Sequence, residues 1–200
     1  MGRRSKRATR CIRCRTHVDL CVCDAVPCLD LRTRLILIMH RNENKKSTAT
    51  GNLALMALSN SELCIHGNRD VPLDLGDLHH AARRLLLLFP SEDAVRLTRE
   101  LLIGDPRPVT LVVPDGSWRQ ASKIGRRVPG LEKAERVSLP PGLPTRYRLR
   151  AENRPDGLAT FEAIARAMGI LETAKVQAQL ERLFNLMVER TLMTRGGAVC

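Results

Sequence analysis

Aromatic side chains are scarce in this sequence, which has three Phe, one Trp and one Tyr among its 200 residues. The hydrophobic fraction is nevertheless 44%, which is enough to build the core of one domain. That core must therefore be aliphatic, packed from Leu, Ile, Val and Ala. Against this background, the one tryptophan, Trp118, calls for an explanation, because it follows closely behind an acid at the end of an apolar run.

The sequence also lacks an apolar run long enough to cross a bilayer. Its first ten residues are basic and no apolar segment follows them, so this stretch is not a secretory signal. Position 6 is Lys, where an N-myristoylation signal has Ser or Thr. We therefore expect a cytoplasmic protein with no membrane partner, in which the seven Cys are metal ligands or free thiols rather than disulfides.

Charge of one sign is in excess, because 33 basic residues outnumber 21 acidic ones and give a formal net charge of +12. Such a surplus favours a polyanionic partner, usually a nucleic acid. The alternative is a chain adapted to solubility or to a GC-rich genome, in which the charge recognises nothing. Residues 1–10 form a basic start that we expect to be disordered, and a flexible cationic arm can contact phosphate without a fold.

Five of the seven cysteines lie within residues 11–30, which we call the Cys segment. Cys11, Cys14, Cys21 and Cys23 form a CxxC and a CxC within thirteen residues. Four thiolates this close can complete a tetrahedral zinc site, which would fold a segment with too few apolar residues to fold alone. We expect a structural metal, although His17 or Cys28 could replace one ligand and the thiols could also be free.

Continuous apolar runs alternate with helical patterns along residues 31–195. The pattern predicts strands over 34–39, 62–67, 84–91, 109–114 and 134–140, and helices over 52–60, 92–104, 117–127, 158–171 and 173–193. Residues 145–150 are expected to be extended or irregular. Strands without polar alternation, separated by helices, are typical of an α/β domain with a mostly parallel sheet. Ligands of such sheets bind at the carboxyl ends of strands, where His40, Pro90 and Asp115 begin polar loops.

The stretch PDGSWRQASKI places an acid, Asp115, at the end of a buried strand. Gly116 permits a tight turn, and Ser117 can cap the helix that carries Trp118 and Ala121 on one face. A carboxylate beside an aromatic ring in a cleft can act as a general base, because partial desolvation raises its pKa. The alternative is that the acid only caps the helix and the ring only packs.

Several motifs in order resemble the DTW-domain family, whose usual signature is Asp-Gly-Thr-Trp followed by Gln-Ala and Lys. PDGSWRQASKI is similar to that signature, HRNENKKSTATG to a His-Pro-x-Glu-x-x-Arg-x-Thr-Asn-Thr-Gly loop, and LLLFPSEDA to a Pro-Ser strand end. The Cys segment, RYRLR and LATFEAIA also agree, so the resemblance covers residues 11 to about 172. This chain has Ser117 in place of Thr, Arg41 in place of Pro, Lys46 in place of Arg and Ala49 in place of Asn.

The resemblance implies a tRNA-uridine aminocarboxypropyltransferase. Such an enzyme moves the 3-amino-3-carboxypropyl group of S-adenosylmethionine to N3 of a uridine and leaves methylthioadenosine. It also implies a fold related to the SPOUT class, with a trefoil knot in the C-terminal half. The expected partner is tRNA, with no DNA partner. A SPOUT-class RNA methyltransferase and a non-catalytic, zinc-stabilised RNA-binding protein are the alternatives.

Each site residue follows from its match to the family motifs or from its place at a strand end. Asp115, which resembles the signature acid, is the candidate base. The candidate cofactor contacts are Thr48, Thr50, Pro90, Ser91, Gly116, Ser117, Trp118, Ala121 and Thr160. The candidate RNA contacts are Lys45, Lys46, Lys123, Arg126, Arg127, Arg146, Tyr147, Arg148 and Arg150.

Two roles stay open at this point. The loop with Lys45, Lys46, Thr48 and Thr50 can hold either the carboxylate of the cofactor or the RNA backbone. Tyr147 can stack on a flipped uracil or simply pack.

Overall fold

The computed structural model describes residues 10–149 and 157–194, apart from residues 69, 72, 74, 76–77 and 79–81. The basic start over residues 1–9 and the candidate RNA contact Arg150 therefore lie outside the described residues. None of the helices in the described part of the chain is both long enough and apolar enough to cross a membrane.

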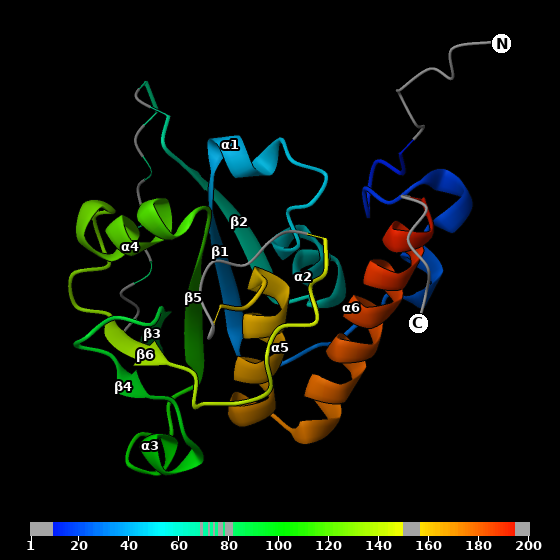
Figure 1. The fold of residues 1–200 in the computed structure, drawn as a ribbon. Coiled ribbons are helices and arrows are strands. Elements are labelled where there is room, and N and C mark those ends of the chain that lie inside the picture. Colours follow the sequence, from blue (N-terminus) through cyan, green and yellow to red (C-terminus); the bar gives the residue numbers. More distant parts are fainter. Residues whose placement is uncertain are drawn as a thin grey trace, which may run out of the picture.

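Within the described residues, six parallel strands form a single sheet (Figure 1). Their order across the sheet is β2-β1-β5-β3-β6-β4, and every neighbouring pair is parallel. The strands are β1 (Arg34–His40), β2 (Ser61–His66), β3 (Arg84–Leu88), β4 (Val95–Arg96), β5 (Val109–Asp115) and β6 (Glu135–Ser138). The predicted α/β fold with a mostly parallel sheet is confirmed, and the C-terminal knot stays a prediction.

The central strands β1 and β5 are apolar along their length because both faces of the sheet are covered. Leu35, Leu37 and Met39 point into the larger core, whereas Ile36 and Ile38 point into a smaller core on the opposite face. The continuous apolar runs of the sequence therefore correspond to strands buried between two layers.

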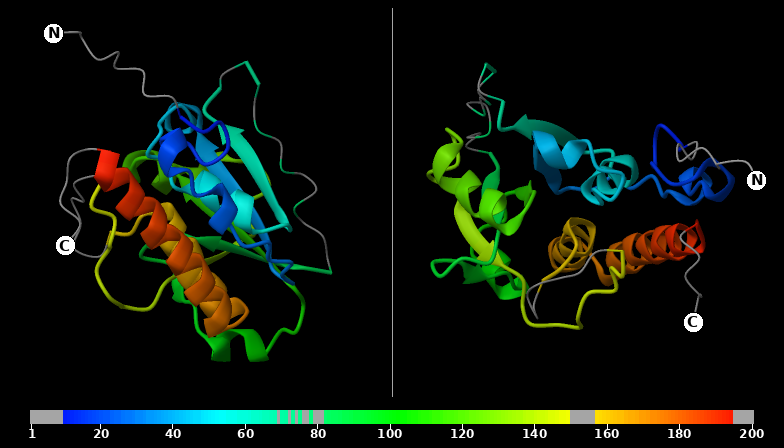
Figure 2. Two further views of the ribbon diagram at one scale, coloured as in Figure 1. Left: turned by 90° about the vertical axis from the view of Figure 1, so that its right-hand side faces the viewer. Right: turned by 45° about the horizontal axis from the view of Figure 1, so that its top comes forward.

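Helices cover both faces (Figures 1 and 2). They are α1 (Arg41–Asn44), α2 (Gly51–Ala57), α3 (Arg99–Ile103), α4 (Trp118–Arg127), α5 (Thr160–Leu171) and α6 (Ala174–Thr194). Residues of α2, α5 and α6 belong to the larger core, and Ile124 of α4 belongs to the smaller one. An apolar stripe on α6 is buried at Val176, Leu180, Leu183 and Met187.

The helix predicted over residues 92–104 is wrong in its first half. Val95 and Arg96 instead form the edge strand β4, which pairs with Val137 and Ser138 of β6. The helix begins only after Thr98, whose hydroxyl accepts the N–H of Leu101 at 3.3 Å. An N-cap inside the amphipathic pattern and an available sheet edge thus override the helical periodicity.

Candidate active site

A cavity of about 690 Å³ opens at the carboxyl edge of the sheet. We call it the main cavity. Its walls come from the loop after β1, the ends of β3 and β5, the segment 139–147, and the start of α5. Of the predicted cofactor contacts, those that line it are Thr48, Thr50, Pro90, Gly116, Ser117, Trp118, Ala121 and Thr160, and the candidate base Asp115 lines it as well.

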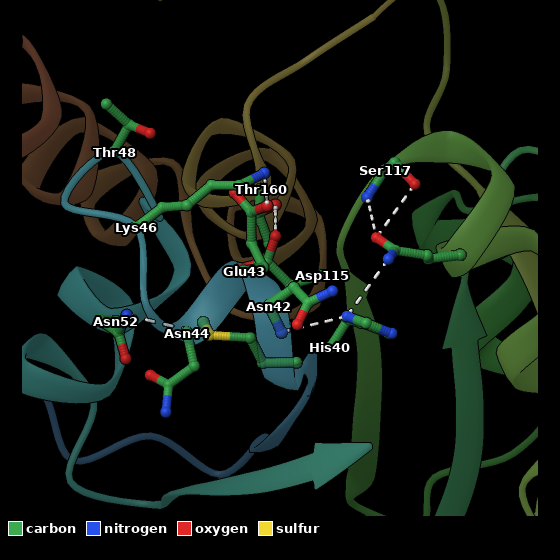
Figure 3. Close-up of polar contacts among 12 residues, drawn as sticks. His40, Asn42, Glu43, Asn44, Lys46, Thr48, Asn52, Asp115, Ser117 and Thr160 are labelled. Carbon is green, nitrogen blue, oxygen red and sulfur yellow. Dashed lines mark hydrogen bonds and ion pairs between the residues drawn. The ribbon is translucent and has the colours of Figure 1, made fainter. Parts of the chain in front are cut away.

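Asp115 is the last residue of β5 and lies beside Met39 of β1 in the sheet register. The residue is 5% exposed, and its Oδ1 accepts a hydrogen bond of 2.7 Å from the Thr160 hydroxyl (Figure 3). Because Thr160 is the first residue of α5, this bond fixes the start of that helix against the end of the strand. The carboxylate is thus held in one orientation at the edge of the cavity.

Glycine 51 gives this carboxylate the space that it occupies. A Cβ at Gly51 would lie 2.6 Å from Oδ2 of Asp115 and 2.8 Å from a methyl carbon of Leu37. Those distances are shorter than any van der Waals contact, so a side chain here would displace the acid or the core beneath it. The first residue of α2 is therefore part of the floor of the site.

A hydrogen-bonded chain fixes the turn that follows Asp115. Gln120 reaches back to Ser117, accepting from its backbone N–H at 2.9 Å and from its hydroxyl at 3.0 Å. The amide nitrogen of Gln120 lies 3.2 Å from Nδ1 of His40, which also accepts the N–H of Asn42 at 3.1 Å (Figure 3). Two N–H groups directed at Nδ1 require a neutral imidazole with its proton on Nε2.

The environment of His40 favours this neutral form. Burial lowers the pKa of His40, and the neighbouring His66 and Arg41 act in the same direction. Burial lowers the pKa of His66 as well, and the charge of Arg127 adds to that effect. Both imidazoles are therefore biased toward the uncharged state at the carboxyl edge of the sheet.

Trp118 lies between the main cavity and a neighbouring groove. The indole is half-buried and its ring centre lies 5.8 Å from that of Phe89, at 59°. Both rings, together with Pro90 and Ala121, line the main cavity and a neighbouring groove of about 840 Å³. The groove is otherwise lined by Leu87, Ser91, Glu92, Asp93, Arg119, Ser122, Gly125, Arg126 and Arg136. Ser91, predicted as a cofactor contact, thus lies in the groove and not in the main cavity.

Tyr147, for which the sequence left packing and stacking open, packs against the core and also lines the main cavity. It is 8% exposed, its ring centre lies 5.8 Å from that of Phe184, and its hydroxyl donates to the carbonyl of Thr48 at 2.7 Å. Its ring therefore contacts the core, and stacking on a flipped uracil stays a prediction. The bond to Thr48 instead joins the segment 139–147 to the loop after β1.

The predicted phosphate contacts lie on two sides of the main cavity. Lys45 and Lys46 follow α1, and Arg146 and Arg148 flank Tyr147, which is bonded to the same loop. Lys123, Arg126 and Arg127 belong to α4. All of these side chains are exposed except that of Lys123, which is half-buried. None of these cationic side chains lines the main cavity, although Arg126 lines the groove beside it, so their contact with an RNA backbone stays a prediction.

Sequence reasoning missed Glu43, which stands at the fourth position of the quoted HRNENKKSTATG loop. Glu43 is 2% exposed, lines the main cavity and forms an ion pair of 2.5 Å with Lys46. A polar loop gave no sign of burial, because the short helix α1 that turns this carboxylate inward was not expected. The glutamate of the resembling loop motif was the available signal.

The four predicted thiols come together in the Cys segment. Their sulfur atoms all lie within 4.8 Å of one another, with Cys11 and Cys23 at 3.6 Å and Cys14 and Cys21 at 3.5 Å. Tetrahedral zinc with bonds of about 2.3 Å needs sulfur atoms about 3.8 Å apart, so the cluster fits this metal. The group consists of these four residues, whereas His17 pairs with Asp19 and Cys28 is exposed.

Two arginines join the Cys segment to the rest of the molecule. Arg190, near the end of α6, donates to the carbonyl of Cys21, and Figure 2 shows this segment beside that helix end. Arg15 donates to the carbonyls of Asn44 at 2.7 Å and Lys46 at 3.3 Å. The backbone of Arg15 has φ 61°, in the left-handed region that residues other than glycine seldom adopt. The Cys segment therefore supports the loop that carries Glu43.

Comparison with known proteins gives three findings. The family model described as the DTW domain matches residues 8–192. The chain is 28% identical to tRNA-uridine aminocarboxypropyltransferase 2 of Drosophila melanogaster over 173 residues, which cover 84% of this chain and 68% of that protein. It is 28% identical to the protein of the same name from Macaca fascicularis over 201 residues, which cover 98% of this chain and 64% of that protein. It therefore spans about two thirds of the length of these curated relatives.

Among solved structures, the SAM-dependent rRNA:acp-transferase Tsr3 from Vulcanisaeta distributa is similar to this chain with a TM-score of 0.48. The alignment has 18% identity and covers 82% of this chain and 79% of that one.

Proposed function

This chain belongs to the DTW domain family, and we propose that it is a tRNA-uridine aminocarboxypropyltransferase. It transfers the 3-amino-3-carboxypropyl group of S-adenosylmethionine to N3 of a uridine in tRNA. The observation that carries the proposal is the main cavity, in which the signature acid Asp115 and the only tryptophan, Trp118, share one wall with Thr160. The relatives bearing the same activity in their names support it.

The main cavity suits a donor of this size and chemistry. Ligand sites are typically about 300–1,000 Å³, mostly apolar, with a few polar groups that fix orientation, and this cavity has about 690 Å³. Leu88, Phe89 and Val113 give it apolar walls at the strand ends, while Glu43 and Asp115 supply charge. An adenosine and a sulfonium can be enclosed on the apolar side while the carbon chain reaches the acids.

Asp115 is the group placed to activate the acceptor. S-Adenosylmethionine supplies an electrophilic Cγ and a thioether leaving group. Asp115 takes the proton from N3–H of uracil as the bond from N3 to Cγ forms and the bond from Cγ to sulfur breaks, its electron pair staying on the sulfur of methylthioadenosine. Thr160 orients the carboxylate through its hydrogen bond to Oδ1. Positioning of the carbon chain, rather than covalent chemistry by the protein, selects Cγ over the methyl group.

The remaining parts of the molecule have supporting roles in this proposal. Trp118 and Ala121 shape the pocket for the groups on sulfur, and the predicted RNA-contacting cations other than Lys46 hold the tRNA backbone. The Cys segment is a structural zinc-binding segment beside a catalytic domain of residues 31–195. We retain the cytoplasm as the proposed location, since the acceptor is tRNA.

Incubation with S-adenosylmethionine and total tRNA, followed by mass spectrometry of the nucleosides, tests the proposal. We expect a uridine heavier by one aminocarboxypropyl group and an equal amount of methylthioadenosine. A methylated nucleoside would replace the proposal by an RNA methyltransferase. Tight tRNA binding with no donor binding and no adduct would replace it by a non-catalytic RNA-binding protein.

A further inference from the structure

Glu43 is a buried carboxylate whose burial has to be compensated. Moving a charged carboxylate out of water is costly unless a partner of opposite charge accompanies it. Its partner is Lys46, whose Nζ lies 2.5 Å from Oε2 of Glu43. The Lys46 side chain is 51% exposed while that of Glu43 is 3% exposed, so the pair extends from the wall of the main cavity toward solvent.

The loop that carries this pair is held in place from two sides. Arg15 of the Cys segment donates to the carbonyl of Lys46 and to both the carbonyl and the side-chain oxygen of Asn44, at 3.3, 2.7 and 3.0 Å. Farther along the loop, the Thr48 carbonyl accepts from Tyr147, and the Thr50 hydroxyl accepts the N–H of Phe161. An ion pair on such a fixed loop is preorganised rather than formed by chance between mobile surface side chains.

We propose that the Glu43–Lys46 pair is the subsite for the amino-acid end of the donor, an inference that rests on the proposed function. An α-amino acid carries an ammonium and a carboxylate on one carbon, and a neighbouring glutamate and lysine are complementary to that zwitterion. Glu43 accepts from the ammonium and Lys46 donates to the carboxylate. Since a lysine has three N–H donors and a carboxylate about four acceptor positions, both contacts can form while the ion pair stays intact.

The two acids of the main cavity then have separate tasks. Oδ1 of Asp115 accepts the hydrogen bond from Thr160, and Oδ2 lies against Gly51, where a larger residue would not fit. Glu43 instead has a cation directly beside it, which suits recognition of a dipolar group rather than proton abstraction (Figure 3). Anchoring the amino-acid end at Glu43 and the sulfur substituents at Trp118 holds the intervening Cγ where N3 can reach it.

Calorimetric binding of two ligands to the full chain separates this subsite from the rest of the cavity. S-Adenosylmethionine has the amino-acid end, whereas methylthioadenosine lacks it. We expect Glu43→Gln and Lys46→Met each to weaken S-adenosylmethionine binding about tenfold or more, as loss of a charge-assisted contact predicts. Methylthioadenosine binding should stay within about twofold of wild type, which also shows that the variants are folded.

Exposed residues outside the cavity supply matched controls. Lys133→Met and Glu189→Gln make the same chemical changes and should alter binding of neither ligand. Equal weakening of both ligands by Glu43→Gln and Lys46→Met, or unchanged S-adenosylmethionine binding, would overturn the subsite while leaving wild-type transfer intact. Failure of the wild-type chain to bind either ligand would overturn the proposed function, and the subsite with it.

Discussion

The Cys segment is joined through Arg15 to the loop that carries Glu43 of the main cavity, but the two regions are stabilised differently. In residues 11–30 the buried side chains are Thr16 and Val22, and of these Val22 belongs to the larger core, so we expect the segment to need a metal held by its four thiols. The walls of the main cavity instead lie at the ends of strands and helices whose side chains pack in the two apolar cores. Metal removal should therefore unfold the Cys segment, whereas the main cavity can lose its chemistry without losing its fold.

The largest expected effect is on chemistry alone. Asp115→Asn keeps the shape and the acceptor for the Thr160 hydroxyl but removes the base. Loss of general-base catalysis lowers rates by about 10²–10⁴-fold. We therefore expect single-turnover transfer to fall by that factor, with tRNA affinity and melting temperature close to those of wild type. Transfer at the wild-type rate would remove Asp115 from the mechanism.

Metal removal should act on the other region. Chelation is expected to bring amide exchange in residues 11–23 close to that of an unfolded chain, because Val22 is the one buried apolar side chain of this stretch, whereas Leu29 stays hydrogen-bonded to Ala57 and Ser59. Amides of β1 and β5 should keep their protection, since the sheet is buried between two cores. Unchanged exchange in the Cys segment after complete metal loss would show that packing, not metal, holds it.

A substitution at Gly51, beside Asp115, tests whether a change in packing also affects catalysis. Gly51→Ala places a methyl group 2.6 Å from Oδ2 of Asp115 and 2.8 Å from Leu37. Overpacking of this kind costs about 1–3 kcal/mol of unfolding free energy, and we expect transfer to fall as well. Gly104→Ala is the control, because no atom lies within 4 Å of its new methyl group. Equal stability of the two variants in urea would contradict the close contact.

Acid should weaken the carboxyl edge of the sheet. The pKa values of His40 and His66 are lowered in the folded state from the ordinary histidine value of 6.5. Below about pH 6.5 the unfolded chain therefore binds more protons at these two residues than the folded chain does. Stability is thus complete above about pH 6.5 and declines as the pH falls through and below that value. Melting temperatures between pH 8 and pH 5.5 check this. His40→Asn should show a smaller decline, and an identical one would exclude His40 as a contributor.

The smallest effect is expected at the link between the two regions. Arg15→Ala removes the hydrogen bonds to Asn44 and Lys46, each worth about 0.5–1.5 kcal/mol at most, and leaves the four thiols in place. We expect S-adenosylmethionine binding to weaken a few-fold, measured by calorimetry. Arg13→Ala, at an exposed position in the same segment, should have no effect. Equal affinities in both variants would show that the Cys segment does not support the Glu43 loop.

The sequence predicted most of the fold because β1 and β5 are continuous apolar runs and α6 has a regular apolar stripe. It also predicted the four thiols, since their spacing is local. The helix over residues 92–104 was wrong because an edge position on the sheet cannot be recognised from periodicity.

The candidate site was predictable where a residue stands at a strand end or matches a family motif. Asp115 and Trp118 follow β5 directly, and the family resemblance marked both. The bond from Thr160 to Asp115 depends on how α5 returns to the sheet, and the burial of Glu43 depends on a four-residue helix. Neither the return of α5 nor the turn of α1 leaves a local signal, so such contacts need the three-dimensional arrangement.

The fate of labelled carbon tests the central claim most directly. The wild-type chain is supplied with total tRNA and S-adenosylmethionine that carries ¹³C either in its carboxylate or in its methyl group. If the main cavity directs Cγ to uridine, the carboxylate label enters the tRNA and the methyl label leaves in methylthioadenosine. Methyl label in the tRNA, with the carboxylate label in a small-molecule product, would contradict the account.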